Sequence, residues 1–323
     1  MEHPHQTYTL KQIHCRPWKL SGFSLKLIES HYENNYGGAM RRLNAITEQL
    51  GAMDFAKTPG HVLNGLKREE LVALNSTLLH ELYFASLGGE GVPTEAMREV
   101  LTRDFGSYDR WKAEFSAMGY ALGGGSGWVV LAYSPRDGRL MNQYASEHSQ
   151  ALSGGVPILA LDMYEHAYHI DFGANARAYV DTFFRNIDWQ ALGDRYEDAA
   201  KVPPLRALVQ AEYGDLPKIG VEEVKAHLAD GHGMQVIDVR PRHFVSRQLD
   251  IAEGVTWRDP ERLREWIGEL SKSEPVVVYC AYGFHVGCNT AVKLREAGFD
   301  ARYMDSGHMG WKAIGGPVKL TTT

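Results

Sequence analysis

Apolar residues in the first half of the chain recur at the spacing of amphipathic helices. Leu25, Ile28 and Tyr32 lie three or four residues apart, which places them on one face of a helix. Leucines repeat this interval further along the chain. The helices expected from the pattern cover residues 24–50, 67–86, 94–122 (as two helices that begin near Thr94 and Ser107) and 175–190.

Short apolar runs bounded by turn residues follow the glycines at 123–125. They predict strands at residues 128–133, 140–144 and 157–161. The segment between the first two runs contains Pro135 and Gly138, which favour a tight turn, so these strands are expected to pair antiparallel. Helices, a small antiparallel sheet and more helices indicate an α+β domain, which we place at residues 1–195.

The pattern of apolar residues changes after a charged, proline-containing stretch at residues 196–217, which we interpret as a linker. Helices and strands then alternate. Strands are expected at 235–239, 276–279 and 301–304, and helices at 221–228, 263–270 and 286–297. This alternation predicts an α/β domain with a mostly parallel sheet at residues 218–323.

Composition narrows the function classes. The 323 residues include 34 Lys and Arg and 40 Asp and Glu, a formal net charge of −6, so we expect no nucleic-acid or membrane partner. The apolar runs are far shorter than the roughly 20 residues that span a bilayer, and the first residues lack a secretory pattern. Three cysteines are too few for a disulfide framework and fit a reducing compartment. A cytoplasmic protein is expected.

Four residues form a candidate metal site. Asp162 ends a predicted buried strand, and His166 follows four residues later. His31 and His80 lie on two predicted helices that an antiparallel hairpin would bring together. Three imidazoles and one carboxylate suit iron or manganese. Taken singly, each residue also has an ordinary structural explanation.

Several segments in this half resemble the iron/manganese superoxide dismutases. They are Gly88-Gly89-Glu90, Asp104-Phe105-Gly106-Ser107, Gly125-Ser126-Gly127-Trp128, Asp162–Tyr168 and Asp188-Trp189. The resemblance implies a helical hairpin followed by an α/β half, with one metal ion between them. It assigns the four protein ligands to His31, His80, Asp162 and His166, adds a water or hydroxide as fifth ligand, and implies disproportionation of superoxide.

The residues expected around the ligands depart from the family pattern. The family's gateway tyrosine falls on Ala39, and its outer histidine falls on Asn35. Tyr36 could replace the missing phenol only if the backbone took a different path. The glutamine of many iron enzymes falls on Ser76, and the manganese-type glutamine falls near His148, with Gln150 close by.

A histidine at that last position occurs in some iron-containing relatives, so the resemblance favours iron over manganese. Tyr164 replaces the tryptophan usual between the last two ligands. The residues expected around the ligands are Tyr36, Trp128, His148, Tyr164, Glu165 and Tyr168. In the family, the positions of Glu165 and Tyr168 bridge a dimer interface, which implies a homodimer that could pair further into a tetramer.

A second candidate site lies near the end of the chain. Cys280 follows the apolar run 276–279 and begins a short loop before a predicted helix. Backbone N–H groups of such a loop and the helix N-terminus would favour a thiolate or persulfide. The loop residues are Ala281, Tyr282, Gly283, Phe284 and His285. The alternative is an inert thiol at the end of a strand.

Residues 218–317 resemble a single rhodanese domain. The motifs are Val236-Ile237-Asp238-Val239-Arg240, the Cys280 loop, Ala297-Gly298-Phe299 and Gly307-His308-Met309-Gly310-Trp311. The resemblance implies a sulfurtransferase in which Cys280 forms a persulfide from a small sulfur donor and passes the sulfur to a thiol acceptor. Asp238 and Arg240 are expected to brace the sheet.

Two loop features depart from that family. His285 stands where arginine is frequent, so thiosulfate need not be the natural donor. Cys288, eight residues after Cys280, could resolve an oxidised Cys280 as a disulfide, or be a buried helix thiol.

Three functions follow from these two sites. The first is metal-dependent superoxide disproportionation with an appended sulfurtransferase. The second is a sulfurtransferase on a dimerising scaffold whose metal site is weak or silent. The third is a sensor in which the metal and Cys280 report redox stress without turnover.

Overall fold

The structure is a computed structural model that describes residues 7–150, 152–202, 212–231 and 233–320. The chain divides into two compact units, residues 1–205 and 206–323. Each has the class expected from the sequence, α+β in the first and α/β in the second. In the described residues, no helix is both long enough and apolar enough to cross a membrane.

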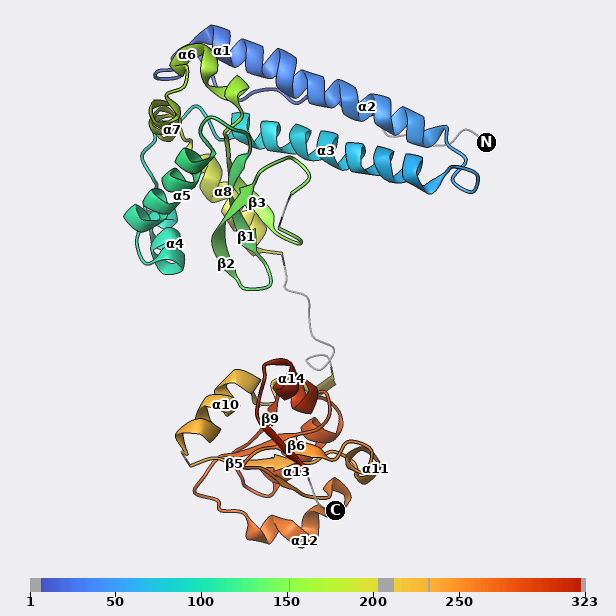
Figure 1. Cartoon of the computed structure of the whole chain (residues 1–323). Helices are drawn as coiled ribbons and strands as arrows, with labels where there is room; N and C mark the ends of the chain where they lie inside the picture. Colours follow the sequence, from blue (N-terminus) through green and yellow to red (C-terminus); the bar gives the residue numbers. More distant parts are fainter. Residues whose placement is uncertain (1–6, 151, 203–211, 232, 321–323) are drawn as a thin grey trace. The chain divides into compact units, whose positions relative to one another are not determined.

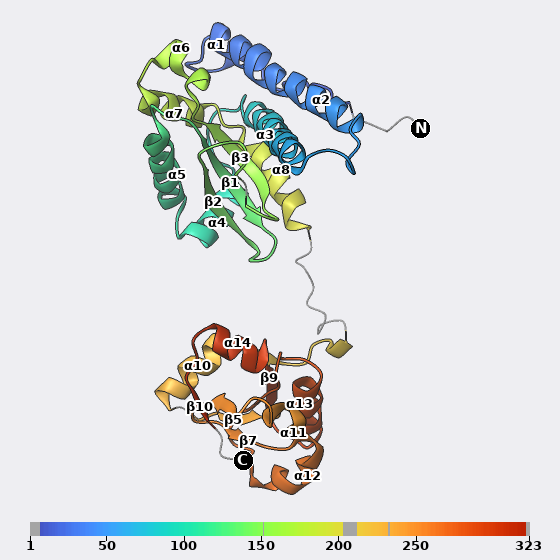
Figure 2. The ribbon, with the colours of Figure 1, turned by 45° about the vertical axis from the view of Figure 1, so that its right-hand side comes forward.

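The first unit begins with a helical hairpin. Its helices are α1 (Leu25–Ser30), a π-helical turn (His31–Tyr36), α2 (Gly37–Gly51) and α3 (Gly60–Ala85). Figures 1 and 2 show α2 and α3 side by side. Ser24 caps α1, since its hydroxyl accepts a hydrogen bond from the Leu27 N–H at 3.1 Å.

A three-stranded antiparallel sheet and further helices complete this unit. The strands are β1 (Trp128–Ser134), β2 (Arg139–Ala145) and β3 (Val156–Asp162), in the order β2-β1-β3. The helices are α4 (Glu95–Phe105), α5 (Tyr108–Leu122), α6 (His169–Phe172), α7 (Ala176–Arg185) and α8 (Trp189–Ala200), with 3₁₀ turns at Pro17–Lys19 and Glu165–Ala167. Thr94 and Ser107 cap α4 and α5, as the sequence predicts. Register pairs Trp128 with Asp162, which brings the ends of β1 and β3 to one place.

The second unit contains a five-stranded parallel sheet in the order β4-β9-β8-β5-β7. Its strands are β4 (Lys218–Ile219), β5 (Gln235–Asp238), β7 (Thr256–Trp257), β8 (Val276–Tyr279) and β9 (Ala301–Met304). A two-stranded antiparallel pair joins β6 (Asp250–Ala252) and β10 (Val318–Leu320).

Helices cover both faces of the parallel sheet. They are α10 (Val221–Asp230), α11 (Arg242–Val245), α12 (Leu263–Trp266), α13 (Val286–Glu296) and α14 (Gly307–Ala313), with 3₁₀ turns at Pro260–Arg262 and Ile267–Glu269. One apolar cluster contains Val224 and Trp311, and the other contains Trp266 and Leu294. All four residues of β8 are buried because this strand lies between the two clusters.

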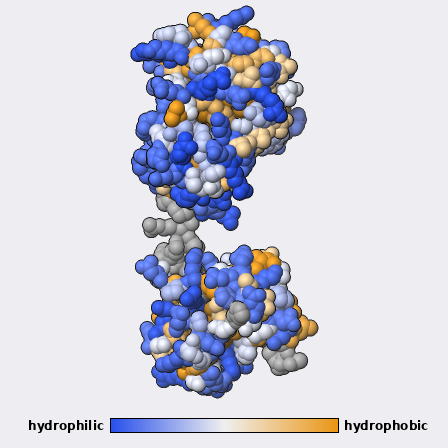
Figure 3. All heavy atoms as spheres, turned by 90° about the vertical axis from the view of Figure 1, so that its left-hand side faces the viewer, coloured by the Kyte–Doolittle hydropathy of each residue, from blue (hydrophilic) through white to orange (hydrophobic). Residues whose placement is uncertain are grey.

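The expected boundaries differ in three places. Helix α3 begins at Gly60, seven residues before the predicted start, directly after Pro59. The predicted helix over 175–190 is two helices, α7 and α8, and α8 continues to Ala200 within the expected linker. Residues 203–211 of that linker lie outside the described residues. Hydrophilic residues predominate on the face of both units shown in Figure 3.

Candidate metal centre and cysteine loop

Four side chains from four elements of the first unit converge on one point. They are His31 of the π-helical turn, His80 of α3, Asp162 at the end of β3 and His166 of the following turn. Their ligand-type atoms all lie within 4.8 Å of one another. Ligands about 2.0–2.2 Å from a shared ion have separations of this order. The structure therefore brings together the four residues that the sequence predicted as ligands.

Asp162 is at the centre of this cluster. Its Oδ2 lies 3.0 Å from His31 Nε2, 3.1 Å from His166 Nε2 and 3.6 Å from His80 Nε2. Burial alone would raise the pKa of Asp162, but His166 and His31 lower it well below its usual range. The carboxylate is therefore ionised, as a cation ligand must be.

The buried histidines are held neutral. Burial and the neighbouring His31 lower the pKa of His80 to about 3, and burial lowers the pKa of His31. His80 Nδ1 lies 2.6 Å from the carbonyl oxygen of Ser76, so the neutral ring donates there and presents an unprotonated Nε2. That Nε2 is buried without a hydrogen-bond partner among the described residues. An orphaned imidazole lone pair beside an ionised carboxylate fits a bound metal cation.

Aromatic rings extend the cluster on one side. His80, His166, Tyr164 and His148 stack in succession, with ring centroids 5.7, 5.4 and 4.8 Å apart. Trp128 is fully buried and packs edge-on against His80 at 5.2 Å. The indole N–H of Trp128 donates to His148 Nδ1 at 2.9 Å. Because indole can only donate, neutral His148 must carry its proton on Nε2.

A cavity of 270 Å³ leads to this cluster. Its lining residues are Asn34, Asn35, Gly38, Ala39, Arg42, Val72, Ala73, Ser76, His80, His148 and His166. Ala39 and Asn35 thus lie where the sequence comparison expected a missing phenol and a missing imidazole. Gln150 is exposed and its side-chain oxygen accepts from the Ser146 N–H at 2.7 Å, so of the two residues considered near this position His148 is the one at the cavity.

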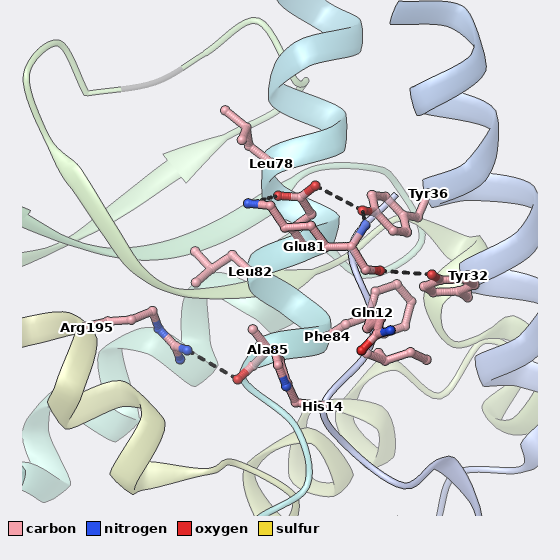
Figure 4. A pocket seen from close by; sticks show the side chains of 12 residues that line it. Gln12, His14, Tyr32, Tyr36, Leu78, Glu81, Leu82, Phe84, Ala85 and Arg195 are labelled. Atoms are coloured by element: carbon pink, nitrogen blue, oxygen red, sulfur yellow. Dashed lines mark hydrogen bonds and ion pairs between the residues drawn. The ribbon is translucent and has the colours of Figure 1, made fainter. Parts of the chain in front are cut away.

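Tyr36 does not restore the missing phenol of this cavity. Tyr36 is the last residue of the π-helical turn that begins at His31. The Tyr36 hydroxyl donates to Glu81 Oε1 at 2.9 Å and accepts from the Lys11 N–H at 2.8 Å. These contacts lie in a separate pocket, lined by the N-terminal segment and α3 (Figure 4). Tyr36 contacts the metal cluster only through its ring, 6.4 Å from His80.

The two expected interface residues have different surroundings. Glu165 is exposed. Tyr168 is only 1% exposed and packs on Tyr179, and its hydroxyl accepts from the Gly124 N–H at 3.2 Å. Tyr168 is therefore a core residue of its own chain, which the periodicity of a short irregular turn could not reveal.

The sequence reasoning also missed Arg42. Arg42 lies three residues after Ala39 on α2, and both residues line the cavity. That spacing was the signal that could have identified it.

Cys280 lies directly after β8, and its residue is 5% exposed. Its Sγ donates to the carbonyl oxygen of Phe284 at 2.9 Å. The expected N–H bonds to the sulfur remain a prediction for the thiolate or persulfide. Tyr282 and Phe284 are exposed, and His285 is the N-cap residue of α13 and has a φ of 51°.

Cys288 is fully buried in α13, and burial raises its pKa to about 12. This favours the buried-thiol interpretation over a resolving cysteine. Cys15 is likewise buried, and burial raises its pKa to about 11. Of the three cysteines in the described residues, Cys280 is the one that lies in a loop between a strand and the N-terminus of a helix.

Comparisons with known proteins agree with both halves. The family of iron/manganese superoxide dismutases, C-terminal domain, matches residues 93–195, and the rhodanese-like domain matches residues 220–314. A "Superoxide dismutase [Fe]" of Cupriavidus metallidurans is 61% identical over 194 residues, which are 60% of this chain and 98% of that protein. One of Aquifex aeolicus is 35% identical over 196 residues, 58% of this chain and 91% of the relative. A "Superoxide dismutase [Mn] 2" of Haloferax volcanii is 34% identical over 188 residues, which are 55% of this chain and 89% of that protein.

Proposed function

Because the chain belongs to the iron/manganese superoxide dismutase family and carries a rhodanese-like domain at residues 220–314, we propose that it disproportionates superoxide and transfers sulfur through Cys280. In the first reaction, two superoxide ions and two protons give one oxygen molecule and one hydrogen peroxide. The observation that carries this proposal is the convergence of three imidazoles and one carboxylate, of which His31, His80 and Asp162 are buried.

His31, His80, Asp162 and His166 would hold one iron or manganese ion. Such an ion would supply one-electron exchange, which no protein side chain in the cluster can supply. Asp162 offsets part of the ion's charge, and the hydrogen bond from His80 Nδ1 to Ser76 fixes the ring that presents Nε2. Iron is favoured because a 61% identical relative is named as an iron enzyme and because His148 stands at the outer position.

The surrounding residues would orient the substrate and move protons. His148 holds a proton on Nε2 and lines the cavity, so it can donate a hydrogen bond to an anion there. Trp128 fixes the tautomer, and Tyr164 lies between His148 and His166 in the ring stack. Ala39 and Asn35 leave the approach open to solvent protons, in place of a protein phenol.

The rate of superoxide decay per bound metal ion tests this function, measured on protein whose iron and manganese are quantified. We expect fast decay that is lost in Asp162→Ala together with the metal. His169→Ala, an exposed histidine near the cluster in sequence, is the control and should retain both. Full metal content with decay no faster than buffer would instead favour the scaffold or sensor function.

For the second reaction, the Cys280 thiolate would attack the sulfane sulfur of a donor, which breaks the donor S–S bond and forms a Cys280 persulfide. An acceptor thiolate then attacks the outer sulfur, and the Cys280 thiolate leaves. What supports this proposal is the placement of Cys280 between buried β8 and the N-terminus of α13.

Thiocyanate release from cyanide and a sulfane donor tests sulfur transfer. Cys280→Ser should abolish it, whereas Cys288→Ser should leave it unchanged because Cys288 is buried. Equal rates in wild type and Cys280→Ser would exclude Cys280 as the sulfur carrier. We also propose a cytoplasmic homodimer formed by the first unit; sedimentation of the purified chain measures the assembly.

A further inference from the structure

The cavity that leads to the metal cluster contains one charged side chain besides its histidines. Among its described lining residues this is Arg42 of α2. Arg42 lines this cavity together with Asn35 of the π-helical turn and Ala39 of α2, which lie closer to His31 in sequence. Ala39, which also lines the cavity, contributes only a methyl group to its wall.

Arg42 is the first member of a chain of alternating charges. It donates to Glu69, whose other carboxylate oxygen lies 3.2 Å from Arg68, and Arg68 lies 3.0 Å from Glu147. Glu147 adjoins His148, and the His148 carbonyl accepts from Asn75 of α3 at 2.7 Å. These bonds join α2, α3 and the segment that carries His148. The two arginines and two glutamates of this chain of charges have no net charge. Their effect on an anion in the cavity therefore depends on where each charge lies.

The charge of the whole chain makes a local cation useful. With a formal net charge of −6, the protein repels an anionic substrate at long range. Arg42 places a positive charge at the wall of the cavity, along the last part of the path. Arg42 has a side chain that is 56% exposed, so its attraction acts through water and is screened by salt.

We infer that Arg42 guides superoxide into the cavity and that Glu69 weakens this attraction while holding Arg42 in place. The inference rests on the proposed superoxide turnover. It makes Arg42 a positioning residue for an anion, and it excludes a purely structural role for the Arg42–Glu69 pair. The two members of the pair should then have opposite effects on capture of the anion.

The test compares four variants by kcat/KM for superoxide at increasing ionic strength. At low salt, Arg42→Gln should lower kcat/KM roughly threefold, and Glu69→Gln should raise it. Arg42→Lys keeps the charge and should retain most of the rate. Arg41→Gln is the matched control, because it makes the same change of net charge at a neighbouring residue that does not line the cavity. The differences should disappear above roughly 0.5 M salt.

Two outcomes would overturn the inference. One is a loss in both Arg42→Gln and Glu69→Gln that is independent of salt, as expected if the pair only holds the fold. The other is equal kcat/KM in Arg42→Gln and Arg41→Gln. If wild type shows no turnover, the proposed function fails by itself. In that case, the association rate of azide with the iron-loaded protein, followed by absorbance, tests the role of Arg42. This rate should be lowered in Arg42→Gln and raised in Glu69→Gln, as expected for kcat/KM.

Discussion

Arg240 and Asp238 form an ion pair that is fully buried in the second unit. Arg240 Nη2 lies 2.6 Å from Asp238 Oδ2 and also donates to the carbonyl oxygen of Asp250 at 2.6 Å. Trp257 in turn donates to the Arg240 carbonyl at 2.8 Å. The pair thus connects the end of β5 to β6 and β7. This agrees with the expectation that these residues brace the sheet.

Removing one member of this pair should strongly lower the free energy of unfolding of the second unit. Arg240→Ala leaves Asp238 buried without its partner, which costs about 3–5 kcal/mol. Urea unfolding of the full chain measures the loss. Arg242→Ala is the control, since its pair with Asp259 is largely exposed at Arg242 and should cost about 1 kcal/mol or less. Similar losses in both variants would contradict this account.

His308 is a second buried residue whose charge matters. It stacks on Tyr279 with ring centroids 5.8 Å apart and is fully buried. Burial, together with the charge of Arg240, lowers its pKa below the ordinary value of 6.5. The unfolded chain therefore binds a proton that the folded chain does not as pH falls through 6.5. Stability from this group is present above that pH and is lost below it.

His308→Phe should make the second unit less sensitive to acid. Phenylalanine keeps a ring against Tyr279 and cannot be protonated. We expect the loss of unfolding free energy between about pH 7.5 and about pH 5.5 to be smaller than in wild type, whatever the change at the higher pH. His243→Phe, at an exposed position of α11, should leave the pH dependence unchanged. An unchanged slope in His308→Phe would assign the acid sensitivity to other groups.

At the scale of elements, regular apolar spacing in the sequence predicted helices and strands, whereas irregular backbone left no such pattern. The long helices, the three antiparallel strands and strands β5, β8 and β9 follow from apolar spacing. The π-helical turn at His31–Tyr36 does not, because it keeps the helix continuous while it changes the direction of each later side chain. The hydroxyl of Tyr36, the last residue of this turn, lies in the pocket of Figure 4. The four ligands were identifiable because resemblance, not periodicity, related distant residues.

Short strands were also missed. β4 and β7 have two residues each, and β6 and β10 have three. Runs of this length carry no alternation, and their pairing depends on partners far along the chain.

The Cys280 loop depends on close backbone packing. A Cβ on Gly283, which has a φ of +78°, would lie 2.4 Å from the Ser306 nitrogen. Gly283→Ala should therefore displace the loop and slow both labelling of Cys280 and sulfur transfer. Gly298→Ala is the matched control: its φ is +86°, yet its nearest contact is the flexible end of Lys272 at 3.4 Å. Equal labelling rates in both variants would mean that the loop tolerates the shift.

At the scale of the whole molecule, each chemistry is contained in one unit. All four candidate ligands lie in residues 1–205, and Cys280 with its loop lies in residues 206–323. Each unit has its own buried apolar core. The two activities should therefore be separable, and the metal should stabilise only the first unit.

Calorimetry of the full chain with and without a chelator measures this independence. We expect two transitions, of which only the one belonging to residues 1–205 moves to lower temperature when metal is removed. Unfolding of the separate fragments 1–205 and 206–323 assigns the transitions. A single transition that shifts as a whole would show that the units unfold together.

The central claim is that His31, His80, Asp162 and His166 hold one iron or manganese ion. Anomalous diffraction at the iron and manganese absorption edges, on crystals of the purified chain, tests it most directly. We expect one peak per chain, located among His31 Nε2, His80 Nε2, His166 Nε2 and Asp162 Oδ2. A peak elsewhere, or none in crystals of protein that consumes superoxide, would contradict it.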